Sequence, residues 1–118
     1  MYRRGRHHTR GGRVERFQVA ALLLLLRERP THGYDLLERL PELIGEERVD
    51  VGNLYRVLRT LEEQGAVHSE WDHTLRGPAK RTYELTAAGA AALDRWAAAL
   101  ADTRNRIDGF LRRYEERR

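Results

Sequence analysis

The sequence predicts a mainly α-helical domain with a small β-hairpin and one long C-terminal helix. Three observations lead to this fold class. Apolar residues recur at helical spacing in three segments before residue 65, and two short alternating stretches follow between residues 66 and 85. After residue 86, a seam of residues is spaced alternately by three and four over three heptads, and Thr103 is its one polar member. The length of 118 residues suits one compact domain.

The first predicted helix covers residues 14–29 and ends before Pro30, because the residue before a proline disfavours the helical conformation. Residues 19–26 are all apolar, which is typical of a helix buried on every side. In so small a domain, one side can face the chain's own core and the other a partner chain. Eight helical residues rise only ~12 Å, whereas a membrane span needs ~20 apolar residues. We therefore expect a soluble, cytoplasmic protein without membrane contact.

Two further helices are expected before the hairpin. Thr31 is a candidate N-cap for a helix over residues 32–40, which Pro41 and Gly45 would end. Asp50 is the natural N-cap of a helix that runs to about Gln64.

The third of these helices has two distinct sides. Leu54, Leu58 and Leu61 form an apolar stripe for the core, and Gly65 follows in the position of a C-terminal glycine. Polar side chains occupy the opposite side.

Residues 66–72 and 81–85 are predicted to form a β-hairpin. Both stretches alternate in part between apolar and polar residues. The segment between them, residues 73–80, contains Gly77 and Pro78 and several cations, which indicates an irregular turn.

The last helix is predicted to begin after a Thr86 cap and to reach Tyr114. Its apolar seam extends beyond the small domain, so a second copy of the chain is the simplest partner. The predicted dimer interface comprises Leu22, Leu25, Leu93, Trp96, Leu100, Ile107 and Phe110. The expected organisation is a flexible basic arm (1–12), a three-helix and hairpin domain (13–85) and a dimerisation helix (86–118).

Three helices followed by a hairpin is the order of a winged helix-turn-helix, in which the third helix enters a DNA major groove. Gly52 would let the backbone approach the DNA, Asn53 could pair with adenine and Arg56 with guanine. Cations beside them suit phosphates, which fix register rather than sequence. The predicted DNA contacts are Tyr34, Gly52, Asn53, Tyr55, Arg56, Arg59, Thr60, Arg76, Gly77, Lys80 and Arg81.

The basic charge is concentrated at the N-terminus. Residues 1–13 hold five of the 22 cationic side chains and no acidic one, which leaves 17 cations against 18 acids in the remainder. The Arg-rich arm could follow a minor groove or the DNA backbone.

Four segments together resemble the PadR family of bacterial transcriptional regulators. They are residues 32–36 (HGYDL), 52–65 (GNLYRVLRTLEEQG), 69–71 (SEW) and 77–89 (GPAKRTYELTAAG). The resemblance implies a dimeric winged-helix repressor, often released from DNA by a small molecule. A homodimer with two equivalent reading helices would face a palindromic site. A single C-terminal helix resembles the family's short branch, in which the first and last helices form the dimer and some members hold planar ligands between subunits. Trp96 is then a candidate effector contact.

The chain departs from the family pattern at the start of the third helix. The family usually has Pro-Gly-Thr or Pro-Gly-Ser before Leu-Tyr, whereas this chain has Val51, Gly52 and Asn53. It often has proline after the tyrosine, where this chain has Arg56. These changes alter side chains that face the groove, so the operator is expected to differ.

Other interpretations stay open. Arg56 could lie on a solvated helix face, Tyr34 and Tyr55 could pack the helix crossing, and Trp71 and Trp96 could belong to the core. The whole chain could be a protein-interaction module on a winged-helix scaffold, or a nonspecific nucleic-acid binder driven by its arm.

Enzymatic and metal chemistry have little support. The sequence has no cysteine, so disulfides and thiolate sites are excluded. His7 and His8 lie in the arm, and His68 and His73 have no third ligand nearby in the sequence. No nucleophile-base-acid set or phosphate-binding glycine loop is present. We expect no enzyme activity, no cofactor and no metal.

Overall fold

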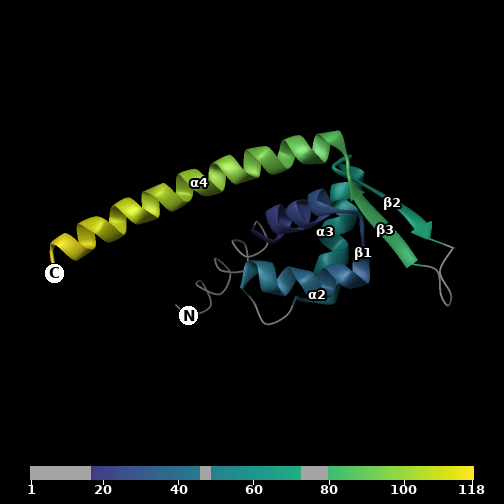
Figure 1. Ribbon diagram of the computed structural model, residues 1–118, viewed down its shortest axis with the longest axis horizontal. Coiled ribbons are helices and arrows are strands. Elements are labelled where there is room, and N and C mark those ends of the chain that lie inside the picture. Colours follow the sequence, from purple (N-terminus) through teal and green to yellow (C-terminus); the bar gives the residue numbers. More distant parts are fainter. Residues whose placement is uncertain (1–16, 46–48, 73–79) are drawn as a thin grey trace, which may run out of the picture.

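The computed structural model describes residues 17–45, 49–72 and 80–118 and confirms the predicted fold class. A helix over residues 17–28 precedes the labelled elements of Figure 1. These are β1 (Thr31–His32), α2 (Gly33–Ile44), α3 (Val51–Glu63), β2 (Val67–Asp72), β3 (Lys80–Leu85) and α4 (Ala87–Glu116). The basic arm over residues 1–12 and most of the hairpin loop, with Arg76 and Gly77, lie outside the described residues.

The hairpin belongs to a three-stranded antiparallel sheet with the order β1-β3-β2. β2 and β3 pair from Val67 opposite Leu85 to Asp72 opposite Lys80. β1 adds Thr31 opposite Tyr83 and His32 opposite Thr82. Sequence analysis missed β1 because two residues cannot display an alternating pattern. This strand attaches the start of α2 to the hairpin.

Two expectations for the second helix are wrong. Thr31 is not its cap: it lies in β1, and its hydroxyl donates to the Arg29 carbonyl at 2.9 Å. His32 occupies the N-cap position without a side-chain capping bond. Pro41 does not end the helix either, since its ring is buried and α2 continues for three more residues. A proline costs one helical hydrogen bond, but its fixed φ is compatible with the helix.

The starts of α3 and α4 agree with prediction, whereas the predicted start of the first helix at residue 14 lies outside the described residues. The Asp50 carboxylate accepts a hydrogen bond from the Asn53 N–H at 2.9 Å, and α3 begins at the next residue. The Thr86 hydroxyl accepts from the Gly89 N–H at 3.0 Å at the start of α4. Gly65 adopts a φ of 79°, a backbone conformation that is unfavourable for residues with a Cβ atom.

The first helix lies at the centre of the core rather than at its edge. Six leucines have the largest fully buried side chains: Leu22, Leu23, Leu36, Leu40, Leu54 and Leu58. Leu25 is also buried, at 5% exposure. The structure therefore places Leu22 and Leu25, which we expected at a dimer interface, inside the chain's own core. The exposed apolar side chains of this helix are Phe17 and Leu24 instead.

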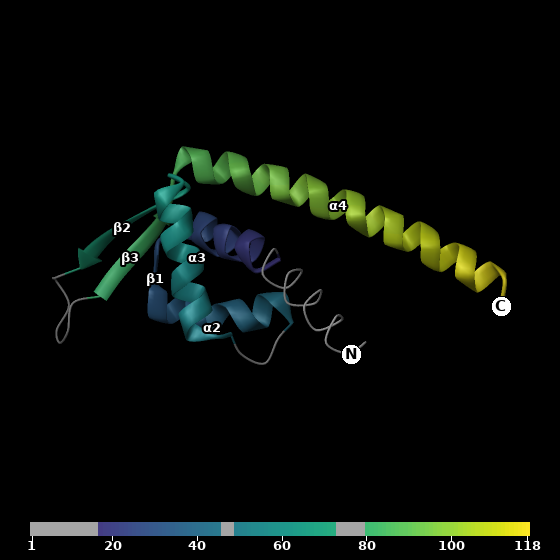
Figure 2. The same ribbon diagram turned by 180° about the vertical axis from the view of Figure 1, so that it is seen from behind.

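α4 leaves the domain as an extended arm (Figures 1 and 2). Among its residues only Gly89 and Leu93 are buried. Large apolar side chains farther along the helix are half exposed or more, namely Ile107, Phe110 and Tyr114. In the described part of the chain, no helix is long and apolar enough to cross a membrane.

The start of α4 packs so closely on the domain that position 89 admits no side chain. A Cβ on Gly89 would lie 2.0 Å from the Ala66 carbonyl oxygen and 2.6 Å from Leu85 Cδ1. The same carbonyl accepts the Thr86 N–H at 3.1 Å, so it cannot move freely. Gly89 thus fixes where the long helix leaves the domain.

We expect Gly89→Ala to lower the free energy of unfolding by about 1–3 kcal/mol, because the added methyl group overpacks a backbone contact. Urea unfolding monitored by circular dichroism measures this change. Gly109→Ala in the same helix is the matched control, since its Cβ would meet only Arg112 at 3.9 Å. That substitution should stabilise the helix by about 0.5–1 kcal/mol. Equal effects at the two positions would contradict the packing argument.

Candidate nucleic-acid interface

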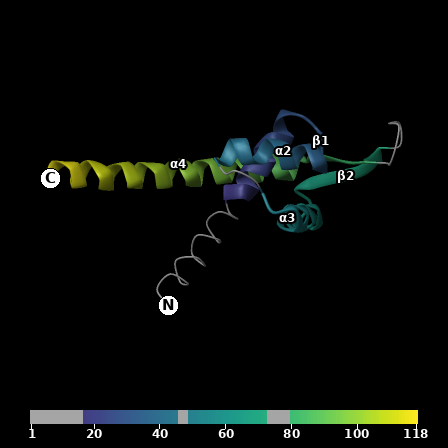
Figure 3. The same ribbon diagram turned by 90° about the horizontal axis from the view of Figure 1, so that it is seen from below.

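α3 has one buried side and one exposed side. Leu54, Leu58 and Leu61 face the core, whereas Gly52, Arg56 and Arg59 are exposed. Figure 3 views α3 almost end-on, at the edge of the molecule beside β2. The exposed side carries two guanidinium groups one turn apart and a glycine without a side chain, a surface that can approach a polyanion closely.

Tyr55 projects from α3 toward the start of α2. A Cβ on Gly33 would lie 2.9 Å from the Tyr55 ring and hydroxyl, so the glycine makes room for the tyrosine. Tyr55 is 36% exposed and Tyr34 is 59% exposed. Tyr55 therefore packs against the start of α2 and still keeps part of its side chain exposed to solvent. Most of the Tyr34 side chain is exposed to solvent.

A hollow of about 660 Å³ lies between the start of α2, α3 and the hairpin. Its lining includes the exposed cations Arg59 and Lys80 and the aromatic side chains of Tyr34, Tyr55 and Trp71. The N-terminus of α2 also opens here, and helix N-termini favour anions. These groups together suit a phosphate of a nucleic-acid backbone.

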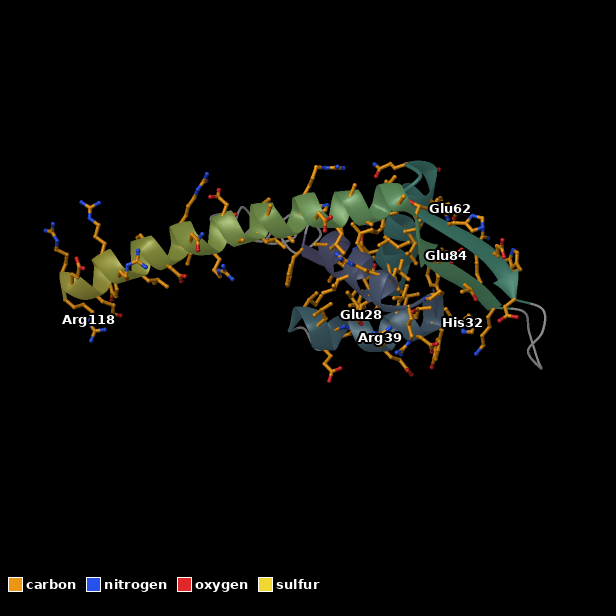
Figure 4. All side chains as sticks on the ribbon, turned by 45° about the horizontal axis from the view of Figure 1, so that its top comes forward. Glu28, His32, Arg39, Glu62, Glu84 and Arg118 are labelled. Carbon is orange, nitrogen blue, oxygen red and sulfur yellow. The ribbon has the colours of Figure 1, made fainter. Side chains whose placement is uncertain are left out.

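Arg81 is engaged within the chain. Its Nε donates to the Ser69 hydroxyl at 2.8 Å, and its guanidinium lies 3.8 Å from the Glu62 carboxylate and 5.3 Å from the Trp71 ring centre. The Ser69 hydroxyl in turn donates to Glu62 at 2.7 Å. Figure 4 labels Glu62, near the base of the hairpin. Arg81 therefore holds the hairpin against α3, whereas Lys80 is the exposed cation of this strand.

Asn53 and Thr60 lie on the side of α3 that turns toward the first helix and α4. The Asn53 amide nitrogen donates to Gln18 Oε1 at 2.9 Å, and its oxygen accepts from Arg56 at 2.5 Å. The Thr60 hydroxyl donates to the Arg56 carbonyl at 3.1 Å. Both polar atoms of the Asn53 amide thus have partners within the chain, and the adenine contact stays a prediction.

The titratable groups of the sheet differ in exposure: His68 and Glu70 are exposed, whereas Tyr83 is buried. The pKa of His68 is raised, chiefly because its ring nitrogen lies 3.1 Å from Glu70. The pKa of Tyr83 is raised because burial disfavours its charged form. His32 lies 3.7 Å from Asp35 and 3.6 Å from Asp72. Among the described residues, no group of three or more His, Asp or Glu side chains could hold a metal ion.

Three residues of the predicted dimer interface line two separate hollows. Leu93 and Leu100 line a shallow apolar groove of about 200 Å³ between the first helix, α2 and α4, together with Phe17, Leu24 and Leu43. Trp96 is partly buried and lies in a separate cavity of about 390 Å³, with Val19, Asn53 and Arg56 also in its lining.

The model of the family described as "Transcriptional regulator PadR-like family" matches residues 22–95. The chain belongs to this PadR-like family. A comparison with curated protein sequences found no significant match.

Solved structures share the fold of this PadR-like chain. A protein of Thermoplasma acidophilum assigned as a transcriptional regulator has 32% identity and a TM-score of 0.72, over 83% of this chain and 93% of that one. A PadR family regulator from Eggerthella lenta has 27% identity and a TM-score of 0.72, over 94% and 96%. Bacillus subtilis PadR, solved in complex with operator DNA, has 26% identity and a TM-score of 0.59, over 67% and 45%.

Family membership also confirms that this PadR-like chain is a regulator rather than an enzyme. The sequence analysis did not anticipate the roles of Gln18, Glu62 and Ser69. Gln18 accepts a hydrogen bond from Asn53, whereas Ser69 and Glu62 hold the partly buried Arg81. The only available signal for Gln18 was a polar residue next to an otherwise apolar helix segment.

Proposed function

We propose that this PadR-like chain is a sequence-specific double-stranded DNA-binding regulator that acts as a homodimer on a palindromic operator in the cytoplasm. The observation that supports this proposal best is the exposed side of α3, with Arg56 and Arg59 beside the cationic hollow of the hairpin. The operator-bound PadR of Bacillus subtilis, which shares the fold, supports it further. Repression follows if bound dimers exclude polymerase from a promoter.

In this proposal α3 lies in the major groove. Arg56 makes the base contact, because guanidinium pairs well with guanine. Arg59 and Lys80 bind phosphates, and Tyr34 and Tyr55 contribute their hydroxyls at the same strand. The loop residues Arg76 and Gly77 and the Arg-rich arm extend the contact along the backbone.

The dimer in this proposal uses the apolar surface that the chain leaves uncovered. It joins Phe17, Leu24, Leu43 and Leu100 to the exposed residues of the outer part of α4, Ile107, Phe110, Leu111 and Tyr114. Large exposed apolar patches mark interaction sites. Leu22, Leu25 and Leu93 support this surface from inside the core.

A small flat effector is the remaining part of the proposal. Trp96 offers a stacking surface, and its cavity also contains Asn53 and Arg56. A molecule that occupies the cavity would compete with the DNA-bound position of Arg56. Release from DNA would then follow directly from effector binding.

Selection of binding sites from random duplex DNA, at a fixed salt concentration near physiological strength, tests the proposal. Enrichment of a palindrome with half-sites about 34 Å apart is the expected result. Binding that depends only on charge, and that disappears when residues 1–12 are deleted, would identify a nonspecific binder. An absence of DNA binding would favour a protein-interaction module on the winged-helix scaffold.

We expect Gly52→Ala to separate stability from DNA binding. A Cβ at position 52 would meet only Asp50, at 3.7 Å, so alanine fits the free protein. It should raise the free energy of unfolding by about 0.5–1 kcal/mol, because glycine is unfavourable within a helix. Fluorescence anisotropy with the selected duplex should show weaker binding, because the methyl group intrudes at the groove. Unchanged affinity would exclude a close approach of the backbone at this position.

A further inference from the structure

We propose that Gln18 and Asn53 are positioning residues that set the orientation of the Arg56 guanidinium before DNA binds. The three side chains form a hydrogen-bonded relay, Gln18–Asn53–Arg56, from the first helix to the exposed side of α3. The effect of this relay on DNA recognition rests on the proposed function, whereas the relay itself is a set of contacts within the chain.

The relay starts from a buried amide. Gln18 is 3% exposed and lies among the leucines of the first helix, where an unsatisfied polar group is unfavourable. Its Oε1 accepts from Asn53 Nδ2 at 2.9 Å, across 35 positions of the sequence. Asn53 therefore has a fixed partner on the core side.

Chemistry fixes the direction of the relay. The side chain of arginine has only donors, so the Asn53 atom that faces Arg56 must be the oxygen. The atom that faces Gln18 must then be the amide nitrogen, and Gln18 must present its oxygen. Each group has one arrangement that satisfies its neighbour, so the amide orientations are mutually determined.

The relay has two consequences for recognition. The Asn53 amide already uses one N–H and one oxygen lone pair within the chain, so we infer that it supports a base contact instead of making one. The hydrogen bond to Asn53 restricts the rotamers of Arg56 before DNA binds. The loss of side-chain entropy on binding is therefore smaller.

Nuclear magnetic resonance of the full chain without DNA tests the relay itself. In Gln18→Leu, we expect the signals of the Asn53 side-chain amide and of Arg56 Nε–H to shift together. Gln64→Leu is the matched control, because Gln64 is exposed, lines the same cavity as Asn53 and lies outside the relay. An Arg56 signal that is unchanged in Gln18→Leu overturns the inference. Both variants are checked for an unchanged thermal unfolding transition, and Asn53→Ala, which changes no core residue, repeats the test on the Arg56 signal.

Binding measurements test the consequence for recognition. The probes are the duplex that the wild-type protein selects and a scrambled duplex of equal composition. Gln18→Leu and Asn53→Ala should each reduce the ratio of the two affinities by about 3- to 10-fold, and the double variant should lose no more than either single one. A loss in Asn53→Ala alone, confined to one base position, would show that Asn53 contacts a base and would overturn the inference. If no duplex is enriched, the proposed function fails, and the resonance measurement still decides on the relay.

Discussion

Leu100→Asp is expected to convert the protein from a dimer to a monomer. Leu100 is 37% exposed in the single chain and lines the apolar groove with Phe17 and Leu24. In a dimer this groove would be covered, and a buried carboxylate without a partner costs several kcal/mol. Light scattering at micromolar concentration should give twice the mass of 13.8 kDa for the wild-type chain and 13.8 kDa for the variant.

Ala98→Asp is the matched control for this experiment. Residues two positions apart lie on nearly opposite sides of a helix, and Ala98 is exposed. The control should remain a dimer and keep its DNA affinity, whereas Leu100→Asp should also lose tight binding to a palindrome. A dimeric Leu100→Asp variant would place the interface away from this groove.

Arg56→Ala is expected to weaken binding to the preferred duplex by about 1–3 kcal/mol, which is roughly 5- to 150-fold, and to relax base choice. The physical reason is the loss of a bidentate contact between guanidinium and a guanine edge. Anisotropy titrations against the selected duplex and its single-base variants measure both effects. Arg95→Ala, which removes an exposed arginine from α4, should leave both unchanged.

Arg59→Ala provides the contrast within the same helix. As a phosphate contact, Arg59 should contribute equally to the affinity for every duplex. Its loss should reduce the slope of log affinity against log salt concentration by about one. If Arg56→Ala behaves in the same way, with equal loss on every duplex, Arg56 is a phosphate contact and the assignment of base recognition is wrong.

Local sequence signals predicted most of the fold. Asp50 and Thr86 were recognisable as caps, and both accept the backbone hydrogen bonds that capping residues accept. The period of the leucines in α3 identified its buried side, which the structure confirms. Pro41 was expected to end the second helix because proline disfavours the helix interior. Burial of its ring, which no local sequence rule includes, keeps it inside α2.

The candidate site was predictable by position but not by contact. Arg56 and Arg59 are exposed as expected, because they lie opposite the leucine stripe. Asn53 and Arg81 lie in the expected elements, but their polar atoms are bound by Gln18, Ser69 and Glu62. Such partners are 12 to 35 positions away, and no local pattern indicates them.

The central claim is that two α3 helices of one dimer bind two half-sites on one face of the DNA. The most direct test is the affinity for the selected palindrome when its spacer is lengthened by up to one helical turn. We predict the highest affinity at the selected spacing. The affinity should be lowest when about five added base pairs rotate one half-site to the opposite face of the DNA. It should recover in part at a full extra turn only if the dimer can span that distance. Affinity that does not depend on the spacer would contradict the dimeric account.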